Sequence, residues 1–287
     1  MAINYSRNQH KIAYEIAIGK KYSKGGNSFL NKIFHFFLTK LFVAKWSIFN
    51  LKQSLLQKFS KEKNDFLNIN FELNKKTDLT KNSFELNDKG YTFVRNFFDE
   101  DTYNILLKNF PAFTNFEHTK KITKNYFICY WYYHTMKFQD IKNIKYNSEY
   151  NSFIKHLASE KFILDLENLI FKDKENYILK NFLCSYKKEG SYLIPHMDSI
   201  YNQTEKTSYN LIYFVDGKNE FPEFSAATGI YADNDFKEPL LIPDDLKNSC
   251  LIYKTSNTNK FFHGFDSVKA DGFAKVCTFL YAHEDIK

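Results

Sequence analysis

The segment IPHMDS, residues 194–199, places His196 and Asp198 two positions apart in an otherwise largely apolar stretch. Residues i and i+2 of a β-strand point to the same face, so a strand here would aim both side chains at one point. A neutral imidazole and a carboxylate are nitrogen and oxygen ligands that suit Fe(II), which also tolerates open coordination positions. The pair therefore predicts two ligands of an iron site and requires a third from elsewhere.

The third ligand is expected to be His263, in NKFFHGFDSVK, 65 residues after Asp198. The intervening segment can supply about three or four short strands, enough to wrap a barrel and return to the first strand. His263 is expected to follow a strand and an Asn-rich turn at residues 257–259. The other downstream candidate, His283, is followed by Glu284 and Asp285, and we expect it to be exposed.

Other chemistries are less well supported by the residues around this pair. Zn²⁺ can also occupy a site of two histidines and one aspartate, as in hydrolases. However, no nearby Glu or His presents itself as the general base that hydrolysis requires. No nucleophile-elbow motif is present for Ser/His/Asp chemistry. A β-barrel that keeps the pair only for structure or ligand capture stays open as a non-catalytic alternative.

The elements that must position the pair are mostly strands in the second half of the chain. Apolar spacing predicts helices at 99–110, capped by Asp99 or Asp101, and at 148–171, with a break near Ser159. A strand is predicted at 91–94, and Asn87–Gly90 is expected to form a turn. Later strands are predicted at 177–188, 191–198, 208–216, 224–233, 249–255 and 272–283. Helices followed by many short strands indicate a helix-buttressed β-sandwich or barrel.

Composition limits the partners and the compartment. A hydrophobic fraction of 44% supports a sizeable core, and the net charge of +7 is too small to predict nucleic-acid binding by itself. The four cysteines form no CxxC pair and lie among apolar residues, which favours reduced, buried thiols. The first 21 residues lack the apolar core of a signal peptide, so a cytoplasmic location is expected.

The N-terminal part is expected to be an extension, residues 1–82, that precedes the main domain at 83–287. Residues 28–58 have helical apolar spacing with a basic polar face, interrupted too often by Lys and His for a membrane span. This helix is expected to pack on the main domain, to contact another subunit, or to bind a membrane surface peripherally. The charged, Asn-rich residues 59–82 indicate a linker.

The flanks of the His-Asp pair resemble a known family. YKKEGSYLIPHMD, residues 186–198, resembles the signature of Fe(II)- and 2-oxoglutarate-dependent dioxygenases, particularly the prolyl-4-hydroxylase-like branch. LIYFVD, FSAATGIYAD and CLIYKTSNTNKFFHGFDSV resemble later strands of that family. The resemblance covers about residues 84–287 and is specific only for 180–281. It implies an α+β fold with a double-stranded β-helix (jelly-roll, cupin-like) core, buttressed by helices.

The resemblance also implies a chemistry. His196, Asp198 and His263 would bind Fe(II), and 2-oxoglutarate and O2 would take the open positions, with ascorbate as a supporting reductant. The enzyme would hydroxylate a C–H bond and release succinate and CO2. The substrate implied is a peptide or amino acid, proline among them, or another small molecule. A glycan or sugar metabolite is the alternative.

The family binds the distal carboxylate of 2-oxoglutarate through a basic residue after the distal histidine. That role falls to Lys275, twelve residues after His263, with Lys269 as the alternative. Tyr186 would donate a hydrogen bond to the cosubstrate, or else fill the core. Tyr213 and Asn210 would line the pocket wall.

Two features depart from the family's pattern. The last strand holds no Arg, and residues 224–227, FSAA, replace a Gly-rich stretch. The aromatic run 126–133 is expected to line the mouth of the site or to fill the core.

Overall fold

The structure of the chain is a computed structural model that describes residues 66–113, 117–119, 133–137, 146–173, 175–189, 191, 193–197, 205–218, 226–232, 236, 238–259, 261–266, 268 and 271–283. Almost all of them belong to one compact unit, residues 64–118 and 133–287. The helix expected at 28–58 and the aromatic run up to residue 132 lie outside the described residues. No helix within the described ranges is long and apolar enough to span a membrane.

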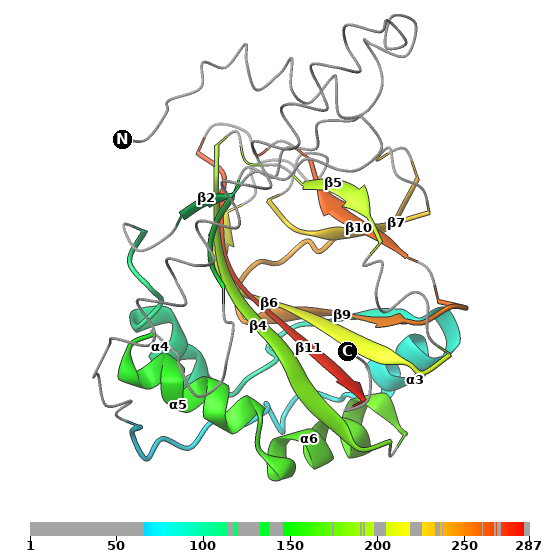
Figure 1. The fold of residues 1–287 in the computed structure, drawn as a ribbon, viewed down its shortest axis with the longest axis horizontal. Coiled ribbons are helices and arrows are strands. Elements are labelled where there is room, and N and C mark those ends of the chain that lie inside the picture. The colour runs from blue at the N-terminus through cyan, green and yellow to red at the C-terminus, as the bar shows by residue number, and fades with distance from the viewer. Residues whose placement is uncertain are drawn as a thin grey trace, which may run out of the picture. The chain divides into compact units, whose positions relative to one another are not determined.

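The larger sheet has seven strands in the order β1-β9-β6-β11-β4-β3-β2 (Figure 1). Neighbouring strands from β1 to β3 pair antiparallel. The bounds are β1 (Tyr91–Val94), β2 (Glu117–Thr119), β3 (Tyr133–Lys137), β4 (Tyr177–Lys188), β6 (Ser208–Lys218), β9 (Ser249–Thr255) and β11 (Phe273–His283).

The smaller sheet has four strands in the order β5-β10-β7-β8, again antiparallel. Its strands are β5 (Leu193–His196), β7 (Gly229–Tyr231), β8 (Pro239–Leu241) and β10 (Phe262–Phe265). β5 lies at the edge of this sheet, where Pro195 is tolerated because an edge strand does not need every backbone N–H for pairing. In Figure 1 the smaller sheet and the helices lie on opposite sides of the larger sheet.

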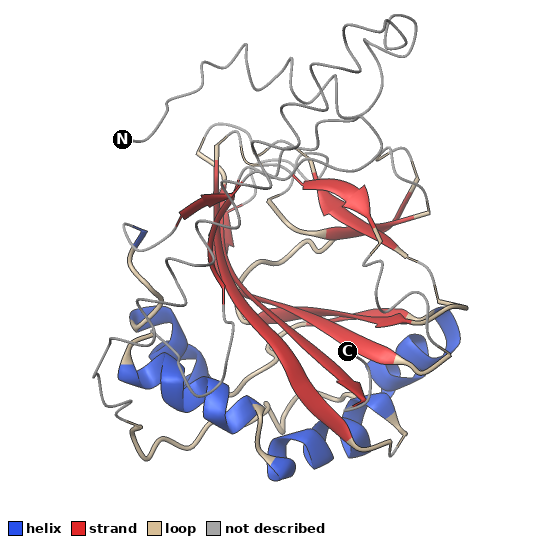
Figure 2. Ribbon diagram, in the orientation of Figure 1, coloured by secondary structure: helices blue, strands red, loops and turns tan. Residues whose placement is uncertain are grey.

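The helices cover one face of the larger sheet, as Figure 2 shows. They are α3 (Thr80–Lys89), α4 (Glu100–Lys108), α5 (Ser148–Leu157), α6 (Glu160–Leu166) and the π-helical turn η3 (Glu167–Phe171). The predicted break near Ser159 is confirmed, since the Ser159 hydroxyl accepts a hydrogen bond from the backbone N–H of Phe162 and begins α6.

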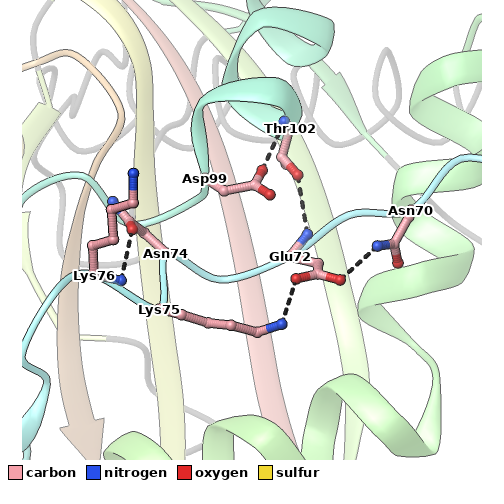
Figure 3. A network of polar contacts seen from close by, with 7 residues as sticks. All are labelled: Asn70, Glu72, Asn74, Lys75, Lys76, Asp99 and Thr102. Carbon is pink, nitrogen blue, oxygen red and sulfur yellow. Dashed lines mark hydrogen bonds and ion pairs between the residues drawn. The ribbon is translucent and has the colours of Figure 1, made fainter.

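A polar network joins the start of α4 to the segment before α3 (Figure 3). The Asp99 carboxylate accepts a hydrogen bond from the Thr102 backbone N–H at 2.8 Å, and the Thr102 hydroxyl accepts one from the Glu72 backbone N–H at 3.0 Å. Phe71, Leu73 and Leu79, from the residues predicted to form a linker, are buried in the core. The described part of that segment therefore packs as part of the folded unit.

Two hydrophobic cores lie on the two faces of the larger sheet. The helix-side core joins the larger sheet to the helices, and on β11 it takes Cys277, Phe279 and Tyr281. The inter-sheet core joins the larger sheet to the smaller one, and on β11 it takes Ala274 and Val276. Successive residues of a strand point to opposite faces, so this alternation assigns every other side chain of β11 to one core or the other.

The antiparallel sheets and packed helices confirm the predicted α+β class. The predicted strands at 177–188 and 249–255 coincide with β4 and β9, and the expected strand at 91–94 is β1. The sequence prediction missed α3, β2, β3, β8 and β10. Residues 87–89 continue α3, and the turn expected there is only its end, where Gly90 adopts φ 82°.

The prediction that His283 is exposed was wrong. Its side chain is buried, because β11 extends to this residue and pairs it with Tyr177 of β4. The His283 Nε2 lies 3.1 Å from a carboxylate oxygen of Glu175. His283 is therefore packed into the structure at the far end of β11.

Candidate functional site

His196 and His263 come together across the β5–β10 pair. The two residues lie directly opposite each other in the antiparallel register, and their ring centroids are 4.3 Å apart at an interplanar angle of 46°. Directly opposed residues of an antiparallel pair project to the same face of the sheet. The structure thus unites two of the three predicted metal ligands, which are 67 positions apart in the chain.

The histidine pair faces the inside of the molecule. His263 is buried, and its ring centroid lies 5.1 Å from that of Tyr253, a residue of β9 in the inter-sheet core. His196, at the end of the edge strand β5, is partly exposed. The pair is therefore buried on the side of the larger sheet, and His196 is partly exposed at the end of β5.

Gly264 allows the two histidine-bearing strands to approach this closely. A Cβ atom at Gly264 would collide with the carbonyl oxygen of Leu193 and would lie 2.7 Å from the backbone nitrogen of Pro195. Both are main-chain atoms of β5, which cannot rotate away as a side chain can. The β5–β10 register also shifts between His263 and Phe265, so β5 bulges at this point.

The third predicted ligand, Asp198, lies outside the described residues. No cluster of three His, Cys, Asp or Glu side chains that could hold a metal occurs in the part of the chain that the structure describes. The two imidazoles are suitable ligands for the expected ion. Histidine nitrogens bind metals at about 2.1 Å, so rings placed side by side on one face of a sheet can share an ion.

The structure does not bring Lys275 to the histidines. Lys275 follows the alternation of Cys277 and Phe279, which places it on the helix side of β11. Its Nζ lies 3.4 Å from a carboxylate oxygen of Asp216, and both side chains are partly exposed. Lys269, the alternative, is outside the described residues.

Tyr186 also lies on the helix side of the larger sheet. It is directly opposite Lys275 in the register, packs against the helix-side core, and its ring meets that of Phe113 edge-on at 5.0 Å. Burial, together with the negative charge of Asp216, raises the pKa of the Tyr186 hydroxyl. This environment fits the packing role that the sequence left open for Tyr186.

Tyr213 and Asn210 occupy different faces of β6. Tyr213 belongs to the helix-side core, and its hydroxyl donates a hydrogen bond to the Asn248 side chain at 3.0 Å. Burial raises the pKa of this hydroxyl well above its ordinary value. Asn210 shares the alternation of Ile212 and Phe214, which belong to the inter-sheet core, and donates to the Thr255 hydroxyl at 3.0 Å. Of the two, Asn210 is on the histidine side.

The polar residue that the sequence interpretation missed is Lys187, next to Tyr186 on β4. Its side chain is almost fully buried, at 2% exposure, and lies on the inter-sheet face with Ala274, its partner on β11. Its Nζ donates hydrogen bonds to the Ala226 carbonyl at 3.0 Å and the Thr228 hydroxyl at 2.7 Å. The one sequence signal was the period of two along β4, which places residues 186 and 187 on opposite faces.

Comparison with known proteins gives similarity in structure alone. No protein-family model matches the sequence. No curated protein matches it either.

One similar solved structure is an oxidoreductase of the 2OG-Fe(II) oxygenase family from Burkholderia pseudomallei, with a TM-score of 0.52, 8% identity, and coverage of 74% of this chain and 94% of that one. A prolyl-4-hydroxylase from Pseudomonas putida has a TM-score of 0.49 and 9% identity, over 72% of this chain and 99% of that one. The chain therefore has the fold of a 2OG-Fe(II) oxygenase.

Proposed function

We propose that the chain is an Fe(II)- and 2-oxoglutarate-dependent dioxygenase that hydroxylates a C–H bond. The observation that carries the proposal is the opposed pair His196 and His263, which faces the inter-sheet core of an oxygenase-like fold. Two imidazoles with a nearby carboxylate form the ligand set of non-haem iron oxygenases. Asp198, two residues after His196, is the proposed carboxylate.

The proposed core is a double-stranded β-helix, or jelly roll. Its support is the way the chain alternates between the sheets: β4, β6, β9 and β11 belong to the larger sheet, and β5, β7, β8 and β10 to the smaller. Two antiparallel sheets filled in this order are typical of jelly rolls. The histidines then belong to adjacent strands of the smaller sheet, and the larger sheet forms the opposite wall.

Each residue of the proposed site has a distinct task. His196, Asp198 and His263 would hold Fe(II), which when bound supplies the chemistry that couples decarboxylation of 2-oxoglutarate to oxidation of the substrate. The Tyr253 ring would pack against the buried His263 imidazole and limit its movement. The apolar inter-sheet core excludes water from the inner side of the site.

The proposed substrate is a peptidyl or free amino acid, with proline included, or another small molecule. Substrate contacts in such folds come from loops around the mouth of the site. Succinate formation should therefore be screened over pools of peptides, amino acids and sugars. A pool that raises succinate above the rate without substrate identifies the class.

The proposal is tested with purified protein, Fe(II), ascorbate and 2-oxoglutarate, by measuring succinate. We expect slow release even without substrate, and we expect His196→Gln and His263→Gln to abolish it. His283→Gln is the matched control, because this histidine is buried at the far end of β11, where its Nε2 lies 3.1 Å from a carboxylate oxygen of Glu175. Unchanged turnover in both site variants would exclude the assignment.

A non-catalytic binding module is distinguished by metal and cosubstrate binding. The enzyme is expected to bind Mn(II) and then 2-oxoglutarate, as measured by calorimetry under argon. A protein that binds neither, yet melts cooperatively, would favour the binding module over the oxygenase.

A further inference from the structure

The side chain of Lys187 places a buried amine in the space between the two sheets. Besides its two hydrogen bonds, Nζ lies 3.9 Å from the ring centroid of Phe265 and 5.6 Å from that of Phe214. Phe265 comes from the smaller sheet and Phe214 from the larger. The amine is therefore enclosed by both sheets.

All the contacts of the Lys187 amine in the described part of the chain are with neutral groups. They are a carbonyl, a hydroxyl and two aromatic rings, and no described carboxylate forms an ion pair with it. Burial lowers the pKa of the Lys187 amine well below its ordinary value. An ammonium without an anion is expensive to bury, and an apolar side chain of similar volume would pack here at lower cost.

The amine lies on the same side of β10 as the histidine pair. Phe265, which contacts it, is two residues from His263, so both side chains project from one face of β10. Two residues of a strand span about 7 Å. A five-carbon dicarboxylate has a comparable length, and it can place one end at the histidines and the other at the amine.

We propose that Lys187 binds the distal carboxylate of 2-oxoglutarate. This inference rests on the proposed function. It assigns to Lys187 the role that the sequence suggested for Lys275, which lies on a different strand and on the opposite face of the larger sheet. The incoming carboxylate supplies the missing counter-charge. Thr228 and the Ala226 carbonyl position the amine before the ligand arrives, and the phenyl rings exclude water.

A purely structural role for Lys187 would be to join β4 to the segment before β7 through its two hydrogen bonds. That role concerns the folded state and predicts no preference for one ligand over another. The test must therefore separate recognition of a distal carboxylate from general integrity of the site.

The experiment compares two ligands that differ at one end. 2-Oxoglutarate and 2-oxopentanoate share the 2-oxo acid group that would meet the metal, but the second has a methyl group in place of the distal carboxylate. Their affinities are measured by calorimetry on Mn(II)-loaded full-length protein under argon, so no turnover is needed. The proteins are the parent, Lys187→Met and the matched control Lys275→Met.

The parent and Lys275→Met are expected to prefer 2-oxoglutarate by about tenfold or more, as for a desolvated charge pair. In Lys187→Met the two ligands should bind within about threefold of each other, with affinity for 2-oxopentanoate retained. That retention would show that the metal end of the site is intact. If Lys187→Met does not fold, Lys187→Gln replaces it, because an amide can keep a hydrogen bond to the Ala226 carbonyl.

Two outcomes would overturn the inference while the proposed function stands: an undiminished preference in Lys187→Met, or its loss in Lys275→Met alone. A parent that binds neither ligand in the presence of Mn(II) would overturn the proposed function itself.

Discussion

His196 and His263 lie directly opposite each other on β5 and β10, with ring centroids 4.3 Å apart. β5 is an edge strand of its sheet, and its one neighbour among the strands that the structure describes is β10. The close approach of the two strands depends on a position without a side chain, Gly264, adjacent to His263.

Gly264→Ala should weaken metal binding more than it weakens the fold. The new methyl group would collide with main-chain atoms of Leu193 and Pro195, so β5 must move away from β10 and carry His196 with it. We expect the free energy of unfolding to fall by about 1–3 kcal/mol. Mn(II) affinity, measured by calorimetry, should fall at least about tenfold.

Gly229→Ala is the control for this substitution. Gly229 lies on β7, the strand on the other side of β10, and is the pairing partner of Gly264. The atom nearest to a Cβ added at Gly229 would be the Leu241 carbonyl oxygen, at 3.0 Å. A smaller adjustment suffices there, and it does not involve β5. Equal loss of Mn(II) affinity in the two variants would mean that the β5–β10 approach does not control the histidine pair.

Lys187 should make the stability of the protein depend on pH. Its pKa is lowered in the folded state, whereas an unfolded chain holds its Lys near about 10.4. Between those two values the unfolded state binds more protons, so this residue's contribution to stability rises with pH and falls as the pH is lowered. The rise is up to about 1.4 kcal/mol per pH unit.

The comparison with Lys187→Met isolates this contribution, since other groups titrate in both proteins. Urea unfolding at pH 7 and pH 9 gives the difference in free energy of unfolding between parent and variant. We expect that difference to shift in favour of the parent at pH 9. A difference independent of pH would mean that the buried amine keeps its charge in the folded state.

Asp99 should matter more than Asp101 for the stability of α4. The Asp99 carboxylate accepts the Thr102 backbone N–H at 2.8 Å, whereas Asp101 lies in the first turn of the helix. Asp99→Ala should lower the free energy of unfolding by about 1 kcal/mol, the ordinary value of an N-cap. Asp101→Ala should cost less than about 0.5 kcal/mol in urea unfolding, and the reverse order would contradict the cap.

Cys184, Cys250 and Cys277 should resist thiol reagents in the folded protein. All three are free and buried, and burial raises the pKa of the Cys184 and Cys250 thiols well above the ordinary value. Thiolates are the reactive form, so reaction should require unfolding. Titration with a chromogenic disulfide in buffer and in urea measures this, and rapid labelling of Cys184 without urea would contradict it.

Runs of strand-forming residues, separated by turn residues, were enough to predict the long strands β4 and β9 at their observed bounds. Capping residues and apolar spacing located α4 and the α5–α6 break. Short elements were harder to predict from the sequence. β8 and β10 have three and four residues, too few for a pattern to emerge, and they exist because neighbouring strands supply their hydrogen bonds.

The histidines could be paired from the sequence because ligand chemistry restricts the choice: few residue types bind iron, and His263 was the candidate at a suitable distance. The basic residue could not be chosen in this way. Lys187 and Lys275 are both strand residues in a chain with 40 Lys and Arg. The sequence analysis chose Lys275, with Lys269 as the alternative, from a family spacing that does not state which face a residue occupies, and it did not consider Lys187.

By itself, then, the sequence determined the α+β class, the long strands, the capped helices and the types of residue that could bind a metal, because these follow from local periodicity and side-chain chemistry. Only the tertiary structure decided which faces meet. It placed His196 against His263, put Lys275 beside Asp216 on the helix side, and enclosed Lys187 between the sheets. The face of a strand on which a residue lies indicates its function only when the sheet packed against that face is known.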